Sequence, residues 1–175
     1  SESRALGYED CLTSASSFVQ LQQWMRKATL AGLQDQERGD HDIDLLAARM
    51  DGVRVAVESV LHSEGWQGLH YSLKHEELAM KHAEQGVLPV GLLSDGVRAM
   101  VSMVADIAWR CTQLNPHLRN DAPQETPGVV LIDGVDLHLH PAWQQTVMGC
   151  LARAFPKVQF IVTTHSPQVL TTVRR

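Results

Sequence analysis

Long hydrophobic runs are missing from this sequence of 175 residues. Its longest apolar stretches, Gly128 to Ile132 and Val158 to Val162, are far too short to cross a bilayer. The first residues, SESRALGYEDC, lack the apolar segment of a secretory signal peptide. We therefore expect a cytoplasmic chain with no membrane partner.

Cysteine and positive charge are also scarce. Cys11, Cys111 and Cys150 lie far apart, without the C-x-x-C spacing of a zinc or redox site. Three separated cysteines predict reduced thiols, as in cytosolic proteins, and not a disulfide framework. The formal net charge of -5 gives no support to a dominant nucleic-acid-binding surface. Nucleic acid remains a compatible partner only through a local basic patch.

What is present is typical of a globular domain, with 44% hydrophobic and 20% charged residues. Residues 1–85 predict a mostly helical region with one or two strands. Two amphipathic stretches flank the polar segment 33–42 there, and the second stretch ends near Gly65. Alternating apolar residues predict a strand over Gly68 to Leu78, and Glu84 to Gly86 predicts a turn.

Residues 86–175 have a clearer alternation of strands and helices. Ser94 can cap a long amphipathic helix that ends at Asn115, because Pro116 disfavours helical geometry in the residue before it. A polar loop follows. The pattern then predicts a strand, a helix, a second strand and a last helix, which begin at Gly128, Pro141, Lys157 and Ser166. Buried apolar strands alternating with helices predict an α/β fold, in which helices flank a parallel sheet.

Three polar segments could carry chemistry. Ser94 and Gly96 stand at a helix N-terminus, which suits a phosphate, although an ordinary Ser N-cap explains the same residues. Asp133 ends an apolar strand, where open α/β sheets bind ligands and where a carboxylate can hold Mg²⁺. A β-hairpin at Asp133-Gly134 is the alternative. His165 follows the next strand and could bind a phosphate, a water or a neighbouring backbone carbonyl.

His138 and His140 have the H-x-H spacing that can supply two metal ligands. No further ligands are evident beside them, so a structural role is favoured. A metal-dependent hydrolase that combines both histidines with Asp133 and Asp136 is the alternative, which metal analysis would test.

The order of the segments LSDGVR, VVLID, VDLHLHP and VTTHSP resembles the C-terminal lobe of ABC-type ATPase heads in the RecF, SMC and OLD-like group. These heads have the P-loop NTPase fold. The resemblance begins near Leu88, which assigns residues 86–175 to the lobe and 1–85 to a family-specific segment. The stretches DLHLHP-x-WQ and QFIVTTHSPQVL are most similar to AAA-family ATPases of anti-phage defence, including the Septu and retron-associated kind.

The resemblance implies ATP and Mg²⁺ as cofactors and gives a role to the loop before the long helix. Ser94 and Gly96 look like signature residues that reach the γ-phosphate of an ATP bound by a partner head. Asp95 and Arg98 belong to the same loop and are expected at the nucleotide. The role of Arg98 stays open at this point.

The resemblance also implies roles for three residues near the ends of the two apolar strands. Asp133 looks like the Walker B aspartate that holds Mg²⁺. Asp136 looks like the D-loop aspartate at the seam between two heads. His165 looks like the switch histidine and is the expected catalytic residue.

Two departures from the family pattern change the expected chemistry. A glutamate usually follows the Walker B aspartate and orients the attacking water, whereas Gly134 stands here, so we expect weak hydrolysis. No G-x-x-x-x-G-K-[ST] motif occurs, and no Gly-Lys dipeptide either. The lobe with the P-loop is therefore expected outside this chain, in a longer polypeptide or a partner. The remaining sheet should expose an edge or a face and make the chain poorly soluble alone.

Together these features predict part of an ATPase that dimerises around ATP and controls an effector nuclease in anti-phage defence. The expected partners are the P-loop lobe or a full-length copy of the same ATPase, in a homo-oligomer of heads, and a nuclease, for which an HNH type is one candidate. Alone, the chain is expected to be inactive as an ATPase. A non-catalytic dimerisation module and a DNA-repair-type ATPase head stay open as alternatives.

Overall fold

The computed structural model describes residues 14–34, 41–137 and 139–171. Cys11, His138 and most of the polar segment 33–42 lie outside this described part. In chain order the elements are α2 Ser14–Gln34, α3 His41–Leu61, β1 Trp66–Ser72, β2 Glu77–His82, β3 Gly86–Pro89, α4 Asp95–Leu114, α5 Ala122–Glu125, β4 Gly128–Ile132, α6 Pro141–Gln144, α7 Val147–Ala154, β5 Val158–Val162 and α8 Pro167–Leu170.

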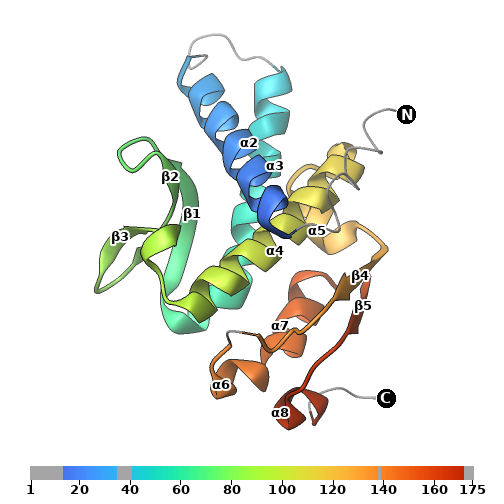
Figure 1. The fold of residues 1–175 in the computed structure, drawn as a ribbon. Helices are drawn as coiled ribbons and strands as arrows, with labels where there is room; N and C mark the ends of the chain where they lie inside the picture. Colours follow the sequence, from blue (N-terminus) through green and yellow to red (C-terminus); the bar gives the residue numbers. More distant parts are fainter. Residues whose placement is uncertain (1–13, 35–40, 138, 172–175) are drawn as a thin grey trace.

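The three long helices form the centre of the molecule (Figure 1). α2 and α3 lie side by side, and α4 packs across them. Apolar residues at helical spacing face this contact, and Leu21, Val57 and Val104 are 0% exposed. Full burial of one such side chain stabilises the fold by about 1.5–3 kcal/mol, so the several buried side chains of this contact contribute strongly to stability.

The ends of α4 lie where the sequence predicts them. Ser94 is the N-cap, and its side-chain oxygen accepts the N–H of Val97 at 3.5 Å. Asn115 is the C-cap, directly before Pro116. The polar loop expected after Asn115 is wrong, since a 3-10 helix, Pro116–Asp121, and the short helix α5 occupy most of it. A proline in the first turn of each favours this, because its fixed φ suits a helix start.

β1, β2 and β3 form an antiparallel sheet beside the helices, in that order. The single strand expected over Gly68 to Leu78 is wrong, because a turn at 73–76 separates β1 from β2. Leu73 continues the apolar alternation, but the next three residues are polar and Glu76 has the left-handed φ of 55°. The turn expected over Glu84 to Gly86 is confirmed, shifted by one residue to 83–85, since Gly86 already begins β3.

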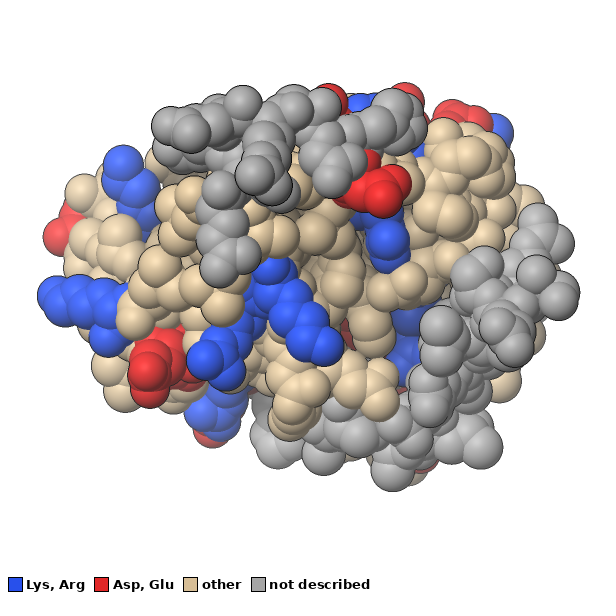
Figure 2. Space-filling view, turned by 90° about the horizontal axis from the view of Figure 1, so that it is seen from above, with Lys and Arg blue, Asp and Glu red and all other residues tan. Residues whose placement is uncertain are grey.

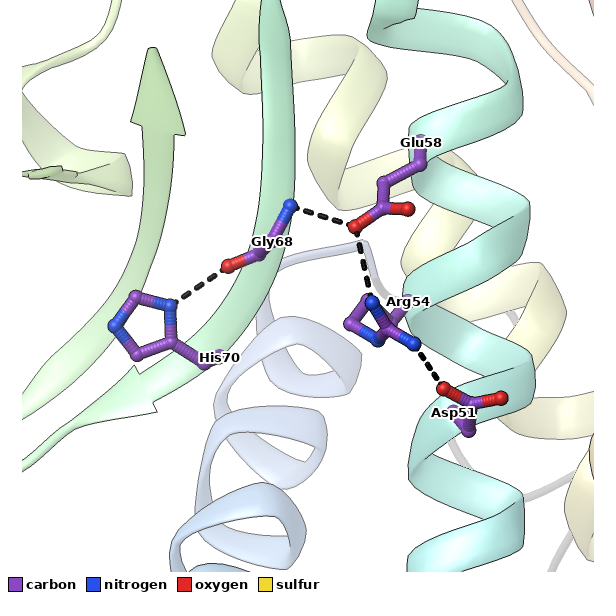
Figure 3. A network of polar contacts seen from close by, with 5 residues as sticks. All are labelled: Asp51, Arg54, Glu58, Gly68 and His70. Atoms are coloured by element: carbon purple, nitrogen blue, oxygen red, sulfur yellow. Dashed lines mark hydrogen bonds and ion pairs between the residues drawn. The ribbon is translucent and has the colours of Figure 1, made fainter. Parts of the chain in front are cut away.

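A polar network joins α3 to β1 (Figure 3). Glu58 accepts the backbone N–H of Gly68 at 2.6 Å and also contacts Arg54, which pairs with Asp51. Gly68 has a φ of 65° at a shift in the β1–β2 register, and Nδ1 of His70 lies 2.7 Å from its carbonyl oxygen. A bulge turns a backbone group away from the ladder, and here the Glu58 carboxylate accepts that N–H.

β4 and β5 form a parallel pair, in register from Gly128 opposite Val158 to Ile132 opposite Val162. The hairpin at Asp133-Gly134 is therefore wrong, since the connection between the strands runs through α6 and α7 (Figure 1). The parallel sheet expected from the two apolar runs is confirmed.

The two faces of this parallel pair differ. Val130, Ile132 and Phe160 pack against the core. On the opposite face Leu131 is 74% exposed, and Val129 and Ile161 are 60% and 51% exposed. Burial of the strands on both sides is thus a wrong expectation, whereas the expected open face is present.

The helix expected from Pro141 is interrupted. α6 ends at Gln144 and α7 begins at Val147. The Thr146 hydroxyl contacts the Ala142 and Trp143 carbonyl oxygens at 3.5 and 3.3 Å, a local bond that competes with regular helix geometry. One side of this segment still packs inward, since Val147, Leu151 and Phe155 are buried and Trp143 is half-buried.

Candidate functional site

The carboxyl ends of β4 and β5 bring two polar loops together. Asp133 and Thr163 directly follow the paired residues Ile132 and Val162. The Thr163 hydroxyl donates to Oδ1 of Asp133 and accepts the backbone N–H of Gly134 at 2.8 Å. This holds the exposed Asp133 carboxylate at the sheet edge, while no hydrogen bond within the described residues occupies its second oxygen.

Asp136 and His165 come from different loops and are linked directly. Oδ1 of Asp136 accepts the Thr164 hydroxyl and the backbone N–H of His165, the latter at 3.3 Å. The Thr164 hydroxyl is the main reason why the pKa of Asp136 lies below its ordinary value, and the His165 N–H acts in the same direction. The Asp136 carboxylate therefore stays ionised beside His165, whose side chain is exposed.

Three residues predicted from the sequence, Asp133, Asp136 and His165, thus lie at one edge of the sheet. The prediction missed Thr163 and Thr164, whose hydroxyls hold the two carboxylates. Both threonines stand in the VTTHSP segment, directly before the histidine. The parallel register places both threonines opposite the loop after β4. The expected pairing of the two strands was therefore the one signal that could have identified them.

Ser94, Asp95, Gly96 and Arg98 form a separate polar group at the start of α4. Arg98 pairs with Asp95 at 2.6 Å and donates to the Gly91 carbonyl oxygen at 3.4 Å. The two charged side chains are 47% and 73% exposed, so this ion pair adds little stability. Among the described residues, the side-chain hydrogen bonds of this group stay on α4 and the loop before it. No such bond reaches Asp133 or its neighbours.

Gly134 follows Asp133 in a left-handed backbone conformation, with a φ of 64°. A Cβ added there would lie 2.5 Å from Cδ1 of Leu137 and 2.8 Å from its Cγ. The Leu137 N–H donates to the Gly134 carbonyl oxygen at 2.9 Å and closes the turn. This turn favours glycine, because a side chain at this φ is strained even if Leu137 moves away.

Asp133 and Thr163 are the described residues that best fit a metal ion. Mg²⁺ is commonly held by one or two carboxylates together with phosphate oxygens, so one carboxylate with a hydroxyl beside it is a suitable partial set. Elsewhere in the described part, no three His, Cys, Asp or Glu side chains gather as a metal site. Nδ1 of His140 accepts the Ala142 N–H at 3.3 Å and caps α6, which favours the structural role over the hydrolase with His138.

Charge is mixed on the face that Figure 2 shows from above. Lys and Arg side chains are scattered over it, and Asp and Glu lie beside several of them. This face thus adds no support for a nucleic-acid partner. Within the described ranges, no helix combines the length and the apolar character that a membrane span needs.

A family model and two proteins named as probable ATPases match this chain. A family model described as "AAA domain, putative AbiEii toxin, Type IV TA system" matches residues 11–171. Over 81 residues the chain is 54% identical to the retron Vc95 probable ATPase of Vibrio cholerae serotype O1 biovar El Tor. This matched stretch is 46% of this chain and 15% of that protein. Over 86 residues it is 51% identical to the retron Ec83 probable ATPase of Escherichia coli, with 49% and 16% covered.

A more distant relative is the Septu protein PtuA of Bacillus mycoides (strain KBAB4), 41% identical over 75 residues, with 43% of this chain and 10% of that protein covered. Among solved structures, the SMC head bound to the C-winged helix domain of ScpA matches with a TM-score of 0.49 and 20% identity, over 73% of this chain and 37% of that chain. The matched part spans only 15% and 16% of the length of the two retron ATPases.

Proposed function

Because this chain belongs to that AAA-domain family, we propose that it supplies half of an ATP site in an ABC-type ATPase of anti-phage defence. In this proposal the complete head binds ATP and Mg²⁺, dimerises around the nucleotide and controls an associated effector nuclease. Similarity to proteins named for retrons and for Septu supports the assignment to defence.

One observation carries the proposal, namely the meeting of Asp133, Asp136 and His165 at the carboxyl edge of β4 and β5. Open α/β sheets bind ligands at this edge, and polar side chains from two consecutive strands converge there. Asp133, with the Thr163 hydroxyl beside it, would hold Mg²⁺, which when bound neutralises charge on phosphate oxygens. His165 would hydrogen-bond the γ-phosphate or a water through its exposed imidazole.

The start of α4 fits a second, separate role. Among the described residues, Ser94 uses its oxygen only as the acceptor of a 3.5 Å contact, which leaves its hydroxyl proton for a phosphate of a partner head. The N-terminal end of a 20-residue helix adds a positive dipole end to this position. Arg98 offsets the negative charge of Asp95, which would otherwise repel an approaching phosphate.

The exposed sheet face supports completion of the head by another lobe. Val129, Leu131 and Ile161 present an apolar surface that the lobe with the P-loop would cover, in the same polypeptide or in a partner. That lobe would supply the backbone N–H groups that hold the α- and β-phosphates, because no described loop here has the sequence for it.

Gly134 makes slow hydrolysis part of the proposal. It has no side chain to position a water or accept its proton, and its turn disfavours one. ATP binding, more than its turnover, would then keep two heads closed, with Asp136 at the seam between them and the nuclease responding to this closed state.

An equilibrium ATP-binding measurement on this chain alone tests the half-site. No appreciable affinity is expected, since the α- and β-phosphates find no loop to hold them. Addition of the P-loop lobe should restore binding. Micromolar affinity of the chain by itself would refute the proposal that an essential lobe is missing.

ATP-dependent dimerisation of the complete head separates an ATPase from a pure dimerisation module. Ser94→Ala and His165→Ala should abolish the ATP-induced dimer. Ser102→Ala, further along α4, and His75→Ala, in the β1–β2 turn, are matched controls that should dimerise normally. If all four variants assemble equally well, the dimerisation module is the correct interpretation.

A further inference from the structure

Gln144, the last residue of α6, uses the two ends of its side-chain amide on different loops. Its Nε2 donates to the Leu139 carbonyl oxygen at 3.0 Å and has a longer contact of 3.5 Å with the Asp136 carbonyl oxygen. Its Oε1 accepts the Ser166 hydroxyl at 2.7 Å. One side chain thereby joins the loop after β4 to the loop after β5.

The chemistry of the partners fixes the orientation of this amide. The carbonyl oxygens of Leu139 and Asp136 can only accept, so the NH₂ end of Gln144 has to face them. The Ser166 hydroxyl then donates to Oε1, and its oxygen accepts the Gln168 N–H at 3.2 Å at the start of α8. Ser166 is only 7% exposed, so few alternative partners from solvent are available to it.

His165 lies between two anchored neighbours. Thr164 before it donates to Asp136, and Ser166 after it donates to Gln144. The His165 backbone N–H itself donates to Asp136 at 3.3 Å. Because the imidazole is exposed, its place depends mainly on the backbone that these bonds hold.

We propose that Gln144 is a positioning residue that sets His165 relative to the loop of Asp136 and couples the movements of both loops. The proposal rests on the proposed function, in which Asp136 meets a second head and His165 faces ATP. Contact of a partner with Asp136 or Leu139 would pull on the Gln144 amide, and Ser166 would pass the displacement to His165. Gln144 acts through Ser166 and has no contact of its own with the nucleotide in this scheme.

The substitution Gln144→Glu tests this proposal, because protonation of the new carboxyl group in acid should restore the lost hydrogen-bond donor. Near neutral pH the carboxylate can still accept from Ser166, but it faces two carbonyl oxygens without a proton to donate. Below about pH 5 a carboxyl in this position takes up a proton and regains the donor. Hydrogen–deuterium exchange at His165 and Ser166, followed by mass spectrometry, should show a roughly tenfold loss of protection at neutral pH and recovery in acid.

Gln145→Glu is the matched control, since it introduces the same charge at the adjacent, exposed residue. It should leave protection unchanged. The unsubstituted protein, followed through the same pH series, accounts for pH effects of the neighbouring His140, His165 and Asp136, the last of which has a lowered pKa, so only recovery specific to Gln144→Glu counts. Equal protection in the two variants at neutral pH, or no recovery in acid, would overturn the proposal.

Gln144→Met covers the case in which the introduced charge prevents folding. Methionine keeps the length of the side chain but has neither polar end, so protection at His165 should fall and stay low at every pH. Full protection in Gln144→Met would mean that packing alone places His165, which also overturns the proposal.

Single-turnover hydrolysis in the complete head separates this proposal from the proposed function. Gln144→Glu should lower the rate roughly tenfold, because it displaces His165 from the γ-phosphate or its water although Gln144 itself makes no contact with the nucleotide. Lost protection with an unchanged rate would refute the coupling. If the unsubstituted head binds no ATP, the proposed function fails, and the exchange experiment still decides whether Gln144 holds His165.

Discussion

The helical centre and the parallel strand pair are stabilised in different ways. α2, α3, α4 and the antiparallel sheet close around apolar side chains, among them Leu21, Met25 and Leu61 at 0–1% exposure. β4 and β5 bury one face and leave Leu131 and its neighbours on the other face in solvent. Their polar loops are held instead by side-chain hydrogen bonds of Thr163, Thr164 and Gln144.

This difference relates structure to the proposed function. A closed core needs no partner, and it gives the strand pair a fixed support. The candidate site residues stand at the carboxyl edge of this strand pair, where loops held by a few hydrogen bonds could rearrange if another lobe and a nucleotide bind as proposed. The exposed apolar face and the proposed partial ATP site thus both belong to the strand pair β4 and β5.

The largest expected effect is the difference in stability loss between a buried and an exposed leucine, each replaced by alanine. Leu61→Ala, at 0% exposure in the closed core, should lower the free energy of unfolding by about 2–5 kcal/mol. Leu131→Ala removes the same atoms at 74% exposure and should change it by about 0.5 kcal/mol or less. Urea denaturation measures both. Similar losses would mean that the sheet face is covered in this chain, and the contrast between the regions would not hold.

The second effect concerns two glycines. Gly134→Ala and Gly86→Ala both place a side chain at positive φ, which costs about 1–3 kcal/mol. At Gly86 the Cβ meets nothing within 4 Å, whereas at Gly134 it displaces Leu137. Gly134→Ala should therefore destabilise more in urea denaturation, and addition of Leu137→Ala should remove the difference. Equal effects of the two single variants would show that Leu137 moves aside freely.

Positions 134 and 137 together also test whether the missing glutamate limits ATP hydrolysis. Gly134→Glu alone combines a new carboxylate with a strained turn, so it has to be compared with Gly134→Glu plus Leu137→Ala in the complete head. A higher rate in the double variant is the expected result. No gain would show that another group limits turnover.

The third effect is the pH dependence of Asp136. Its pKa is lowered in the folded chain, so the stability it contributes is present above the ordinary value of 3.8 and is lost as the pH falls through the lowered pKa. Thr164→Val removes the largest cause and should raise this pKa towards 3.8 in an NMR titration. Thr171→Val, at the end of α8, is the control. An unchanged titration of Asp136 would exclude Thr164 as the cause.

The smallest expected effect is the difference in alkylation rate between the thiols of Cys111 and Cys150. Burial raises the pKa of Cys111 on α4 to about 11, so this thiol should stay protonated and unreactive near pH 8. Cys150 on α7 is half-buried and should react first. Mass mapping after alkylation of native and urea-unfolded protein measures both rates. Equal labelling in the native protein would indicate that the core around α4 opens readily.

Local signals in the sequence predicted the elements that depend on them. Ser94 and Asn115-Pro116 fixed both ends of α4, because caps and prolines act within a few residues. Apolar runs before Asp133 and Thr163 located both parallel strands. The α/β class and the resemblance to AAA-family ATPases of the retron and Septu kind are confirmed. The division at residues 85 and 86 and the roles of single site residues stay predictions.

Other features could not be predicted because they depend on contacts across loops. Leu73 continues an apolar alternation although it lies in a turn, so periodicity alone joined two strands. The side chains of Thr164 and Gln144 act on residues that lie 28 and 22 positions away, at Asp136 and Ser166. Such pairs follow from the strand register and the direction of each side chain, which composition and spacing leave open.

The left-handed turn at Gly134 also limits which sequences evolution can reach from this one. A single codon change to glutamate would place a side chain in a strained backbone and against Leu137, so its first effect is a less stable protein. Selection for faster hydrolysis would favour that change only after position 137 or the turn itself had altered. Positions 134 and 137 should therefore vary together among natural descendants, and the slow turnover proposed above would be difficult to reverse in one step.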